Sequence, residues 1–131
     1  MGYTATVSQE YQTGLVVGSD YMTGQEMVDA CAALVTDPRW EPGFDEVWDL
    51  SGSTEVDVTP DGLAAMVEAS HKHADKIGDS RCVFVVSRDG VEAVLRLFAR
   101  LTRDLPRTYH IARTLEEAEA WLGLEPRTLG R

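Results

Sequence analysis

The run Cys82-Val83-Phe84-Val85-Val86 decides the fold, because its apolar side chains would occupy both faces of a strand. A strand that is buried on both faces is typical of a parallel sheet with helices on either side. We therefore place this run at the centre of an α/β domain.

Further strands are predicted on both sides of that run. Glu46-Val47-Trp48-Asp49-Leu50 precedes it, and Thr108-Tyr109-His110-Ile111 is the last strand. Near the N-terminus, residues 3–7 and 15–17 are expected to form a hairpin around the turn Gln12-Thr13-Gly14. The predicted fold class is α/β, with a mixed, mostly parallel sheet of four or five strands, an N-terminal hairpin and about four flanking helices.

Helix starts are marked by capping patterns. Thr23-Gly24-Gln25-Glu26 and Thr114-Leu115-Glu116-Glu117 both match the capping box, and Thr59-Pro60 combines an N-cap with a proline at the first helical position. A fourth helix is predicted over about 88–103. Residues 55–58 are extended, either as a short edge strand or as a loop.

Length and composition suit one soluble domain. The chain has 131 residues, of which 44% are hydrophobic, so a single domain over 1–131 is expected, with 125–131 as a frayed tail. Cys31 and Cys82 lie far apart within apolar segments, which favours a reducing compartment. Neither a signal peptide nor a run of about 18 apolar residues is found, so we expect a cytoplasmic protein without membrane insertion.

The charge is unevenly distributed along the chain. The net formal charge of −10 argues against nucleic-acid binding. Residues 1–80 carry fifteen acids against three bases, whereas residues 81–113 carry seven arginines against three acids. Arg96, Arg100 and Arg103 would form one stripe on a helix. That stripe is either a solvated face or a docking face for an acidic partner or a phosphate. A homodimer would use the exposed edge of the hairpin or this arginine-bearing helix.

Four stretches of sequence together resemble a known family. They are Thr23–Glu26, the loop Asp37-Pro38-Arg39-Trp40-Glu41-Pro42-Gly43-Phe44, the strand end Trp48-Asp49-Leu50-Ser51, and Thr114–Leu122. The chain resembles the small bacterial STAS-like proteins, relatives of the anti-sigma-factor antagonists, over nearly its whole length. The resemblance implies a mixed sheet flanked by helices and a protein without catalysis of its own.

The same resemblance points to regulatory hydroxyl groups. Phosphorylated anti-sigma antagonists carry an Asp-Ser-Ser-Gly-like motif at a helix N-terminus, where this chain has Asp57-Val58-Thr59-Pro60-Asp61-Gly62-Leu63. Thr59 is the nearest equivalent hydroxyl and Ser51 is the second candidate. The motif itself is absent and a proline follows the threonine, so an ordinary N-cap is the alternative interpretation of Thr59.

The loop after Asp49 is the predicted ligand position, since ligands of α/β sheets bind beyond the carboxyl ends of strands. Asp49, Ser51, Asp57 and Thr59 are therefore candidate regulatory or ligand residues for a small or lipid-like molecule. Hydrogen bonding to loop amides is the simpler role for Asp49. Trp40, in a proline-rich loop, is a candidate docking residue alongside the three arginines.

An enzyme is the contrary hypothesis. Asp49 and Ser51 with His71 or His110 would make a small hydrolase, but no recognisable spacing of nucleophile and base supports it. His71 and His73 lie two residues apart on a predicted helix and would point about 200° from each other, so they are not expected to bind one metal ion. No cofactor is predicted.

The sequence therefore favours a non-enzymatic STAS-like binding or regulatory module. It would act through protein contacts, with a partner or with itself, or through a small bound ligand. A lipid or small-ligand carrier and a structural subunit of a larger assembly are the remaining alternatives.

Overall fold

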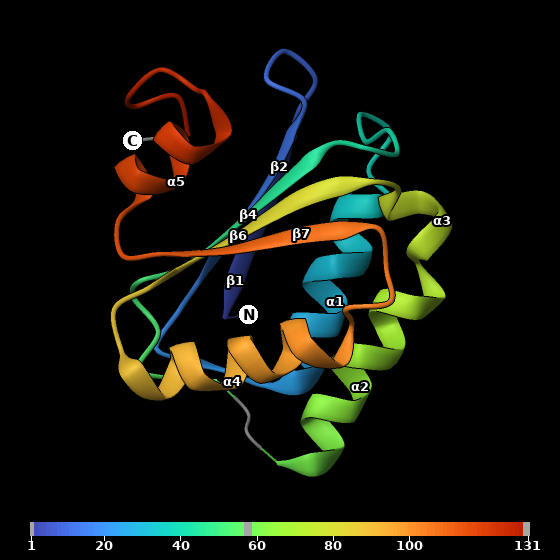
Figure 1. The fold of residues 1–131 in the computed structure, drawn as a ribbon, viewed down its shortest axis with the longest axis vertical. Helices are drawn as coiled ribbons and strands as arrows, with labels where there is room; N and C mark the ends of the chain where they lie inside the picture. The colour runs from blue at the N-terminus through green and yellow to red at the C-terminus, as the bar shows by residue number, and fades with distance from the viewer. Residues whose placement is uncertain (1, 57–58, 130–131) are drawn as a thin grey trace.

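The computed structural model describes residues 2–56 and 59–129. The strands are β1 (Tyr3–Ser8), β2 (Thr13–Gly18), β3 (Tyr21–Met22), β4 (Asp45–Leu50), β5 (Glu55–Val56), β6 (Ser80–Val86) and β7 (Arg107–Ala112). The helices are α1 (Gly24–Val35), α2 (Pro60–Lys72), α3 (Ala74–Ile77), α4 (Asp89–Leu101) and α5 (Leu115–Leu122). Helices α1, α2 and α4 cover one face of the sheet and α5 lies on the other (Figure 1).

The predicted fold class is confirmed. Within the described residues, five strands form a sheet in the order β1-β2-β4-β6-β7, and β1 and β2 are its antiparallel hairpin. The remaining neighbours pair in parallel. The predicted hairpin turn was placed too late, because Thr13 and Gly14 already belong to β2 and Gln12 takes a positive φ of 51° before them. The pairing of the short strands β3 and β5 was not predicted from the sequence.

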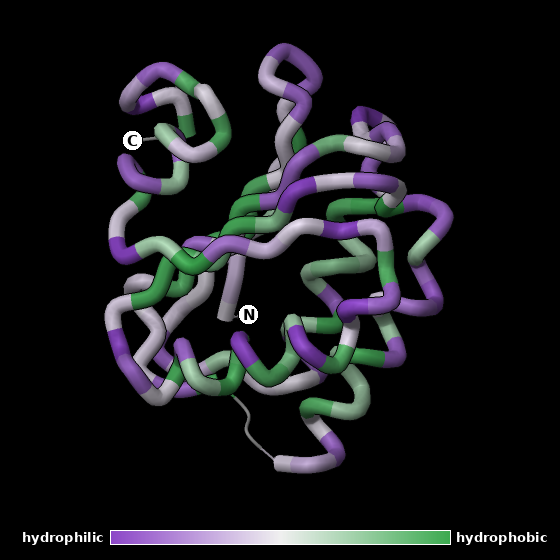
Figure 2. The backbone as a smooth tube through the Cα atoms, viewed as in Figure 1, coloured by the Kyte–Doolittle hydropathy of each residue, from purple (hydrophilic) through white to green (hydrophobic). Residues whose placement is uncertain are grey.

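Strand β6 is central and buried on both faces, as its sequence predicts. Cys82, Phe84 and Val86 pack into the larger core beneath α1, α2 and α4. Val83 and Val85 pack into a second core beneath α5. In Figure 2 the hydrophobic colour is interrupted by polar positions on the neighbouring strands, and many hydrophilic residues lie in the loops.

The predicted caps form hydrogen bonds. Thr23 completes both halves of a capping box at α1, and Thr59 Oγ1 accepts the N–H of Gly62 at the start of α2. Thr114 caps α5, but the Glu117 carboxylate accepts the N–H of Arg113 instead of that of the cap. The predicted second helix is interrupted at its C-terminal end, so that α3 forms a separate turn.

Two glycines set the spacing of α1 and α2. A Cβ atom at Gly24 would lie 2.7 Å from the Cα of Gly62, so the helix starts touch backbone to backbone. This close approach fixes the helices over the sheet at their N-terminal ends. Their side chains then enclose the space above β4 and β6, where the candidate site lies.

The C-terminal segment is packed, which corrects the predicted frayed tail over its described part, 125–129. The Glu119 carboxylate of α5 is 1% exposed and accepts the N–H groups of Arg127 and Leu129 at 3.1 and 2.9 Å. The Leu129 side chain is buried in the second core. A buried carboxylate that binds two amides holds this segment over the sheet.

We expect Glu119→Ala to lower the free energy of unfolding by about 2–3 kcal/mol, because one buried and one partly buried amide lose a charged acceptor. Urea denaturation measures the loss. Trypsin cleavage after Arg127 should become faster in the same variant. The matched control is Glu116→Ala, an exposed carboxylate on the same helix, and equal loss in both variants would contradict the role of Glu119.

Candidate functional site

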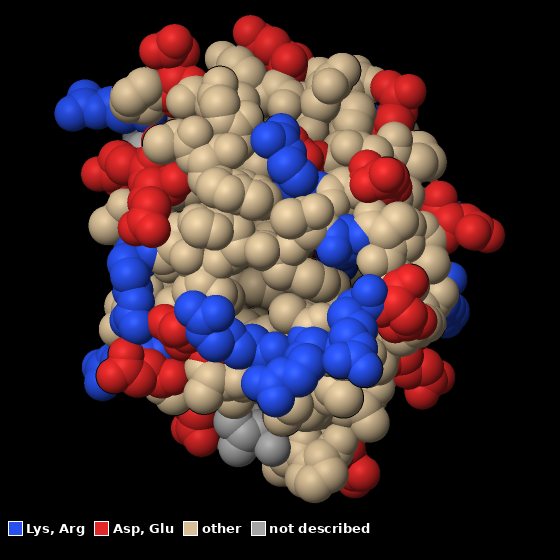
Figure 3. All heavy atoms as spheres, in the orientation of Figure 1, with Lys and Arg blue, Asp and Glu red and all other residues tan. Residues whose placement is uncertain are grey.

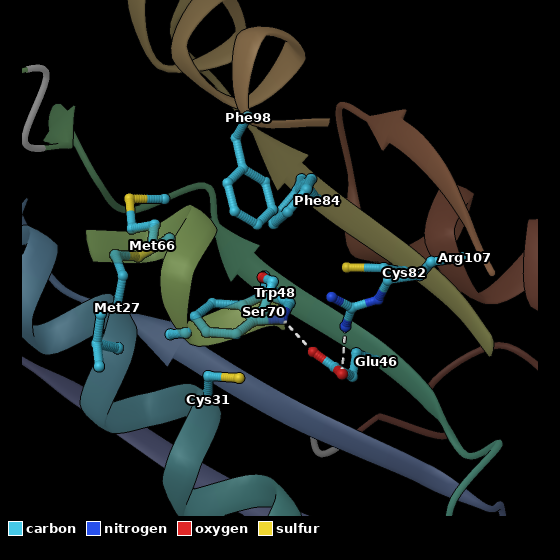
Figure 4. Close-up of a pocket in the computed structure, with 12 residues that line it drawn as sticks. Met27, Cys31, Glu46, Trp48, Met66, Ser70, Cys82, Phe84, Phe98 and Arg107 are labelled. Atoms are coloured by element: carbon cyan, nitrogen blue, oxygen red, sulfur yellow. Dashed lines mark hydrogen bonds and ion pairs between the residues drawn. The ribbon is translucent and has the colours of Figure 1, made fainter. Parts of the chain in front are cut away.

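A buried ion pair lies in the otherwise apolar layer between the sheet and helices α1, α2 and α4. Glu46 projects from β4 and Arg107 from β7, and their side chains are 1% and 3% exposed. Oε2 of Glu46 and Nη2 of Arg107 are in contact (Figure 4). The two side chains meet above Cys82 of β6, which pairs with Glu46 in the sheet register.

Neighbouring side chains hold this pair in place. Trp48 Nε1 donates a hydrogen bond of 2.8 Å to Oε1 of Glu46. The Arg107 guanidinium lies 5.5 Å from the centre of the Tyr109 ring, a cation–π distance. The Tyr109 hydroxyl is 2.8 Å from Oγ1 of the buried Thr102. The pair is therefore tied to β4, to β7 and to the end of α4.

Two polar atoms of this cluster lack a hydrogen-bond or ion-pair partner among the described residues. They are Nε of Arg107 and Oγ of Ser80, whereas Nη2 of Arg107 and Oε2 of Glu46 are partners in the ion pair. Each buried polar group left without a hydrogen bond costs about 1–3 kcal/mol, so these atoms favour a partner that can reach them.

A cavity of about 30 Å³ adjoins the pair. A site needs about 10–15 Å³ of such volume for each water, so this one has room for about two waters or the end of a small molecule. Its wall is mainly apolar and, besides the ion pair, includes Met27, Cys31, Met66, Cys82, Phe84 and Phe98. Figure 4 shows these side chains pointing from both helices and strands toward one space.

The ionisation states of the lining groups follow from burial and from the pair itself. Burial, the largest single effect, opposes the charge on Arg107, but the Glu46 carboxylate together with Cys82, Tyr109 and Cys31 holds the pKa of Arg107 above its ordinary value. Burial, then the Glu46 carboxylate, raises the pKa of Cys31 to about 12, and burial raises that of Cys82 as well. Both thiols therefore stay protonated, and neither supplies a thiolate nucleophile.

Comparison with known proteins gives a match of structure only. No protein-family model and no curated protein matches the sequence. An uncharacterised protein of the DUF3478 family with a SpoIIAA-like fold, from Shewanella loihica PV-4, is 14% identical, with a TM-score of 0.59 over 92% of this chain and 91% of that one.

The anti-sigma factor antagonist SpoIIAA, in its unphosphorylated form, is 8% identical, with a TM-score of 0.52 over 92% of this chain and 97% of that one. The chain has a STAS-like fold. The predicted resemblance is thereby confirmed at the level of the fold.

Asp49 and Ser51 lie together at the end of β4 in this STAS-like fold. Oδ1 of Asp49 accepts hydrogen bonds from the N–H of Ser51, at 3.1 Å, and from its hydroxyl, at 2.6 Å. The hydroxyl of Ser87 donates to the carbonyl of Ser51. Asp49 thus orders the loop through hydrogen bonds, and hydrogen bonding to loop amides is the simpler role predicted for it.

Thr59 and Asp57 are the other two candidate residues of the loop region. Thr59 is exposed and caps α2 through Gly62, so its hydroxyl has the geometry of an N-cap. Asp57 lies outside the described residues. The candidate regulatory role of Thr59 and Ser51 stays a prediction.

Trp40 is not at the surface, contrary to the exposed role expected for it. It is 8% exposed, its Nε1 donates to the carbonyl of Lys76 at 2.7 Å, and its ring meets Phe44 edge to face. The proline-rich loop folds inward because this large side chain fills the gap beside α3. Its position does not support docking.

The arginine stripe is present on α4 and just beyond it. Arg96, Arg100 and Arg103 are exposed, and Arg96 pairs with Glu92 at 2.7 Å. No ion pair within residues 2–56 and 59–129 involves Arg100 or Arg103. Two of the predicted docking arginines therefore have charges that no carboxylate of the described chain neutralises.

The structure does not favour the hydrolase alternative. His71 is bonded to Asp104 at 2.8 Å and to the carbonyl of Val67 at 3.0 Å. His110 stacks on Trp121 at 4.7 Å, on the α5 side of the sheet. Among the described residues no hydrogen bond joins a histidine to Asp49 or Ser51, and no group of His, Cys, Asp or Glu is arranged to hold a metal ion.

No helix among the described residues has the length and apolarity needed to cross a membrane.

The sequence reasoning missed the buried pair, although part of its signal was available. Glu46 alternates with Trp48 and Leu50, so a charge stands on an otherwise apolar strand face. Arg107 was missed because the last strand was predicted to begin one residue later. With Arg107 included, it alternates with Tyr109 and shares the face that points to Glu46.

We predict strong energetic coupling between Glu46 and Arg107. Glu46→Gln and Arg107→Met should each lower the free energy of unfolding by about 3–5 kcal/mol, because each leaves one buried charge without its partner. The double variant should lose less than either single variant, since glutamine still accepts from Trp48 and no unpaired charge remains. Additive losses in urea denaturation would contradict a coupled pair.

His71 in α2 and His73 at the C-cap of that helix should titrate in a fixed order. The bond to Val67, then Asp104, raises the pKa of His71 above 6.5, whereas burial lowers that of His73. Protonated His71 donates both bonds, so its stabilisation is complete below the unfolded pKa and is lost as the pH rises through the raised folded value. An NMR titration should show His73 deprotonating first as the pH rises. The reverse order would contradict the contact with Asp104.

Proposed function

We propose that the protein is a non-enzymatic STAS-like binding module that holds a small ligand in the cavity beside Glu46 and Arg107. The observation that carries the proposal is the buried guanidinium, whose Nε–H has no acceptor among the described residues, beside a cavity with a mainly apolar wall. Buried polar groups of this kind are normally paired with protein, water or ligand.

The chemistry of the polar end follows from the pair. Glu46 and Arg107 balance each other's charge, so a second ionised group would enter an apolar site without a counter-ion. The group of the pair that is left over is the Nε–H donor of Arg107. A neutral hydrogen-bond acceptor, such as a carboxamide or a hydroxyl, satisfies it.

The rest of the ligand must be apolar and compact. Five of the twelve lining residues are phenylalanine, tryptophan or methionine, and the volume of about 30 Å³ limits a ligand to a few heavy atoms unless the wall moves. Met27 and Met66 provide that freedom, because methionine adapts its shape more readily than branched or aromatic residues. Small aliphatic amides and alcohols fit these limits.

Binding without catalysis is the better account of the same site. Both cysteines that line it are protonated thiols, and the histidines of the described chain lie elsewhere. The structural neighbours support a regulatory or binding module. The free, buried cysteines also agree with the cytoplasmic location expected from the sequence.

The test is a thermal and NMR titration of the intact chain with butyramide, valeramide and 1-butanol. Binding should stabilise the folded state by about 1.4 kcal/mol when the free ligand is about ten times its Kd. The shifted resonances should belong to the side chains of the cavity wall. Native mass spectrometry of protein purified from its own cells would test for a retained molecule.

Matched variants connect any binding to the cavity. Cys31→Val places an extra methyl group in the cavity and should weaken binding. Ala33→Val adds bulk to the exposed face of the same helix and should not affect it. If none of the probes shifts a cavity resonance and native protein carries no small molecule, the cavity is a structural water site and the proposal is wrong.

A further inference from the structure

We propose that the free edge of β7, together with α4, docks an acidic extended segment of a partner protein as an added strand. A groove of about 400 Å³ separates the two elements. We call it the β7–α4 groove, and its lining residues are Arg96, Ala99, Arg100, Tyr109, His110 and Ile111. The inference concerns a surface that the proposed ligand cavity does not include.

The strand edge is available for pairing. β7 ends the sheet order and is bonded on one side to β6, and within residues 2–56 and 59–129 no strand pairs with its other side. Alternate residues of an edge strand direct N–H and C=O groups outward, which makes such an edge a template for an added strand. β7 runs unobstructed across the view in Figure 1.

The charge beside this edge is positive. Figure 3, in the same orientation, shows a row of basic side chains along α4 below a surface with few charges. Arg96 is partly neutralised by Glu92, whereas Arg100 and Arg103 have no ion pair within the described part of the chain. This concentration of positive charge, on a chain whose net charge is −10, favours a partner segment that carries carboxylates.

Apolar contacts accompany the charge. Ala99, Tyr109 and Ile111 line the groove, and their side chains would lie beneath the added strand. Leu97 and Leu101, 40% and 48% exposed, lie on α4 outside the groove lining, to one side of the arginine stripe.

A second copy of this chain fits the groove poorly. Two β7 edges related by a two-fold axis would bring two arginine rows together without intervening acids, and like charges in contact oppose association. Pairing of β7 with the opposite edge strand, β1, would generate an open chain of subunits. The acidic partner avoids both difficulties.

The partner segment has a definable pattern. β7 has six residues, so a segment of about that length would pair along it. Because side chains alternate along a strand, every second residue would face α4. Carboxylates at those positions would meet Arg96 and Arg100, as in an alternating sequence of glutamate and valine.

The experiment is an NMR titration of the full labelled chain with a capped hexapeptide of alternating Glu and Val. Amide shifts should be confined to β7 and α4, and the lysine–valine counterpart should cause none. Binding should weaken as salt is added, because exposed charges are screened. The variant Arg96→Glu with Arg100→Glu, which reverses the charge of both arginines that line the groove, should bind the acidic peptide at least about tenfold more weakly.

The matched control is Arg88→Glu with Arg127→Glu, which changes the net charge equally at exposed positions outside the groove. It should alter the affinity less than about twofold. Equal weakening in both variants, or shifts outside β7 and α4, would overturn the proposal. So would a concentration-dependent dimer that the groove variant abolishes, since the occupant would then be a second copy.

Discussion

Burial of β6 on both faces is the constraint on which the rest of the structure depends. A central parallel strand exposes no face to water, so the chain must supply a layer on each side. The larger layer comes from α1, α2 and α4. The opposite face of the sheet is covered by the short helix α5 and by the segment that follows this helix. Glu119 is buried in α5 for that reason, since its carboxylate holds the backbone at Leu129 over Val83 and Val85.

The Glu46–Arg107 pair places two charges in the larger, otherwise apolar layer. Replacing a buried ion pair by well-packed apolar residues is often neutral or stabilising, so the pair is a poor choice if packing is its sole purpose. It also brings polar atoms into a region where Trp48 supplies one hydrogen bond and the cavity supplies space. A requirement to recognise a polar group is a physical reason to keep such a pair in a core.

The fold was predictable because its signals are local, whereas the site depends on contacts between distant residues. The double-sided apolar run of β6 and the caps at Thr23 and Thr59 each lie within a few residues, and all are found in the structure. Glu46 and Arg107 are 61 positions apart and meet only through the strand order and register. The inward position of Trp40 is likewise set by its bond to the Lys76 carbonyl, which no local pattern contains.

The two proposed sites share β7 and would therefore influence each other. Arg107 and Tyr109 point from this strand into the polar cluster, while its outer edge and the ring of Tyr109 border the groove. A ligand that bonds to the Arg107 guanidinium restrains the strand to which a partner segment would pair. If it favours the conformation that accepts the segment, the partner must increase the affinity for the ligand by the same factor, because coupling free energies are reciprocal. A strand fixed on one face by a buried charge and open along its edge is thus a direct physical route from a small ligand to a protein contact.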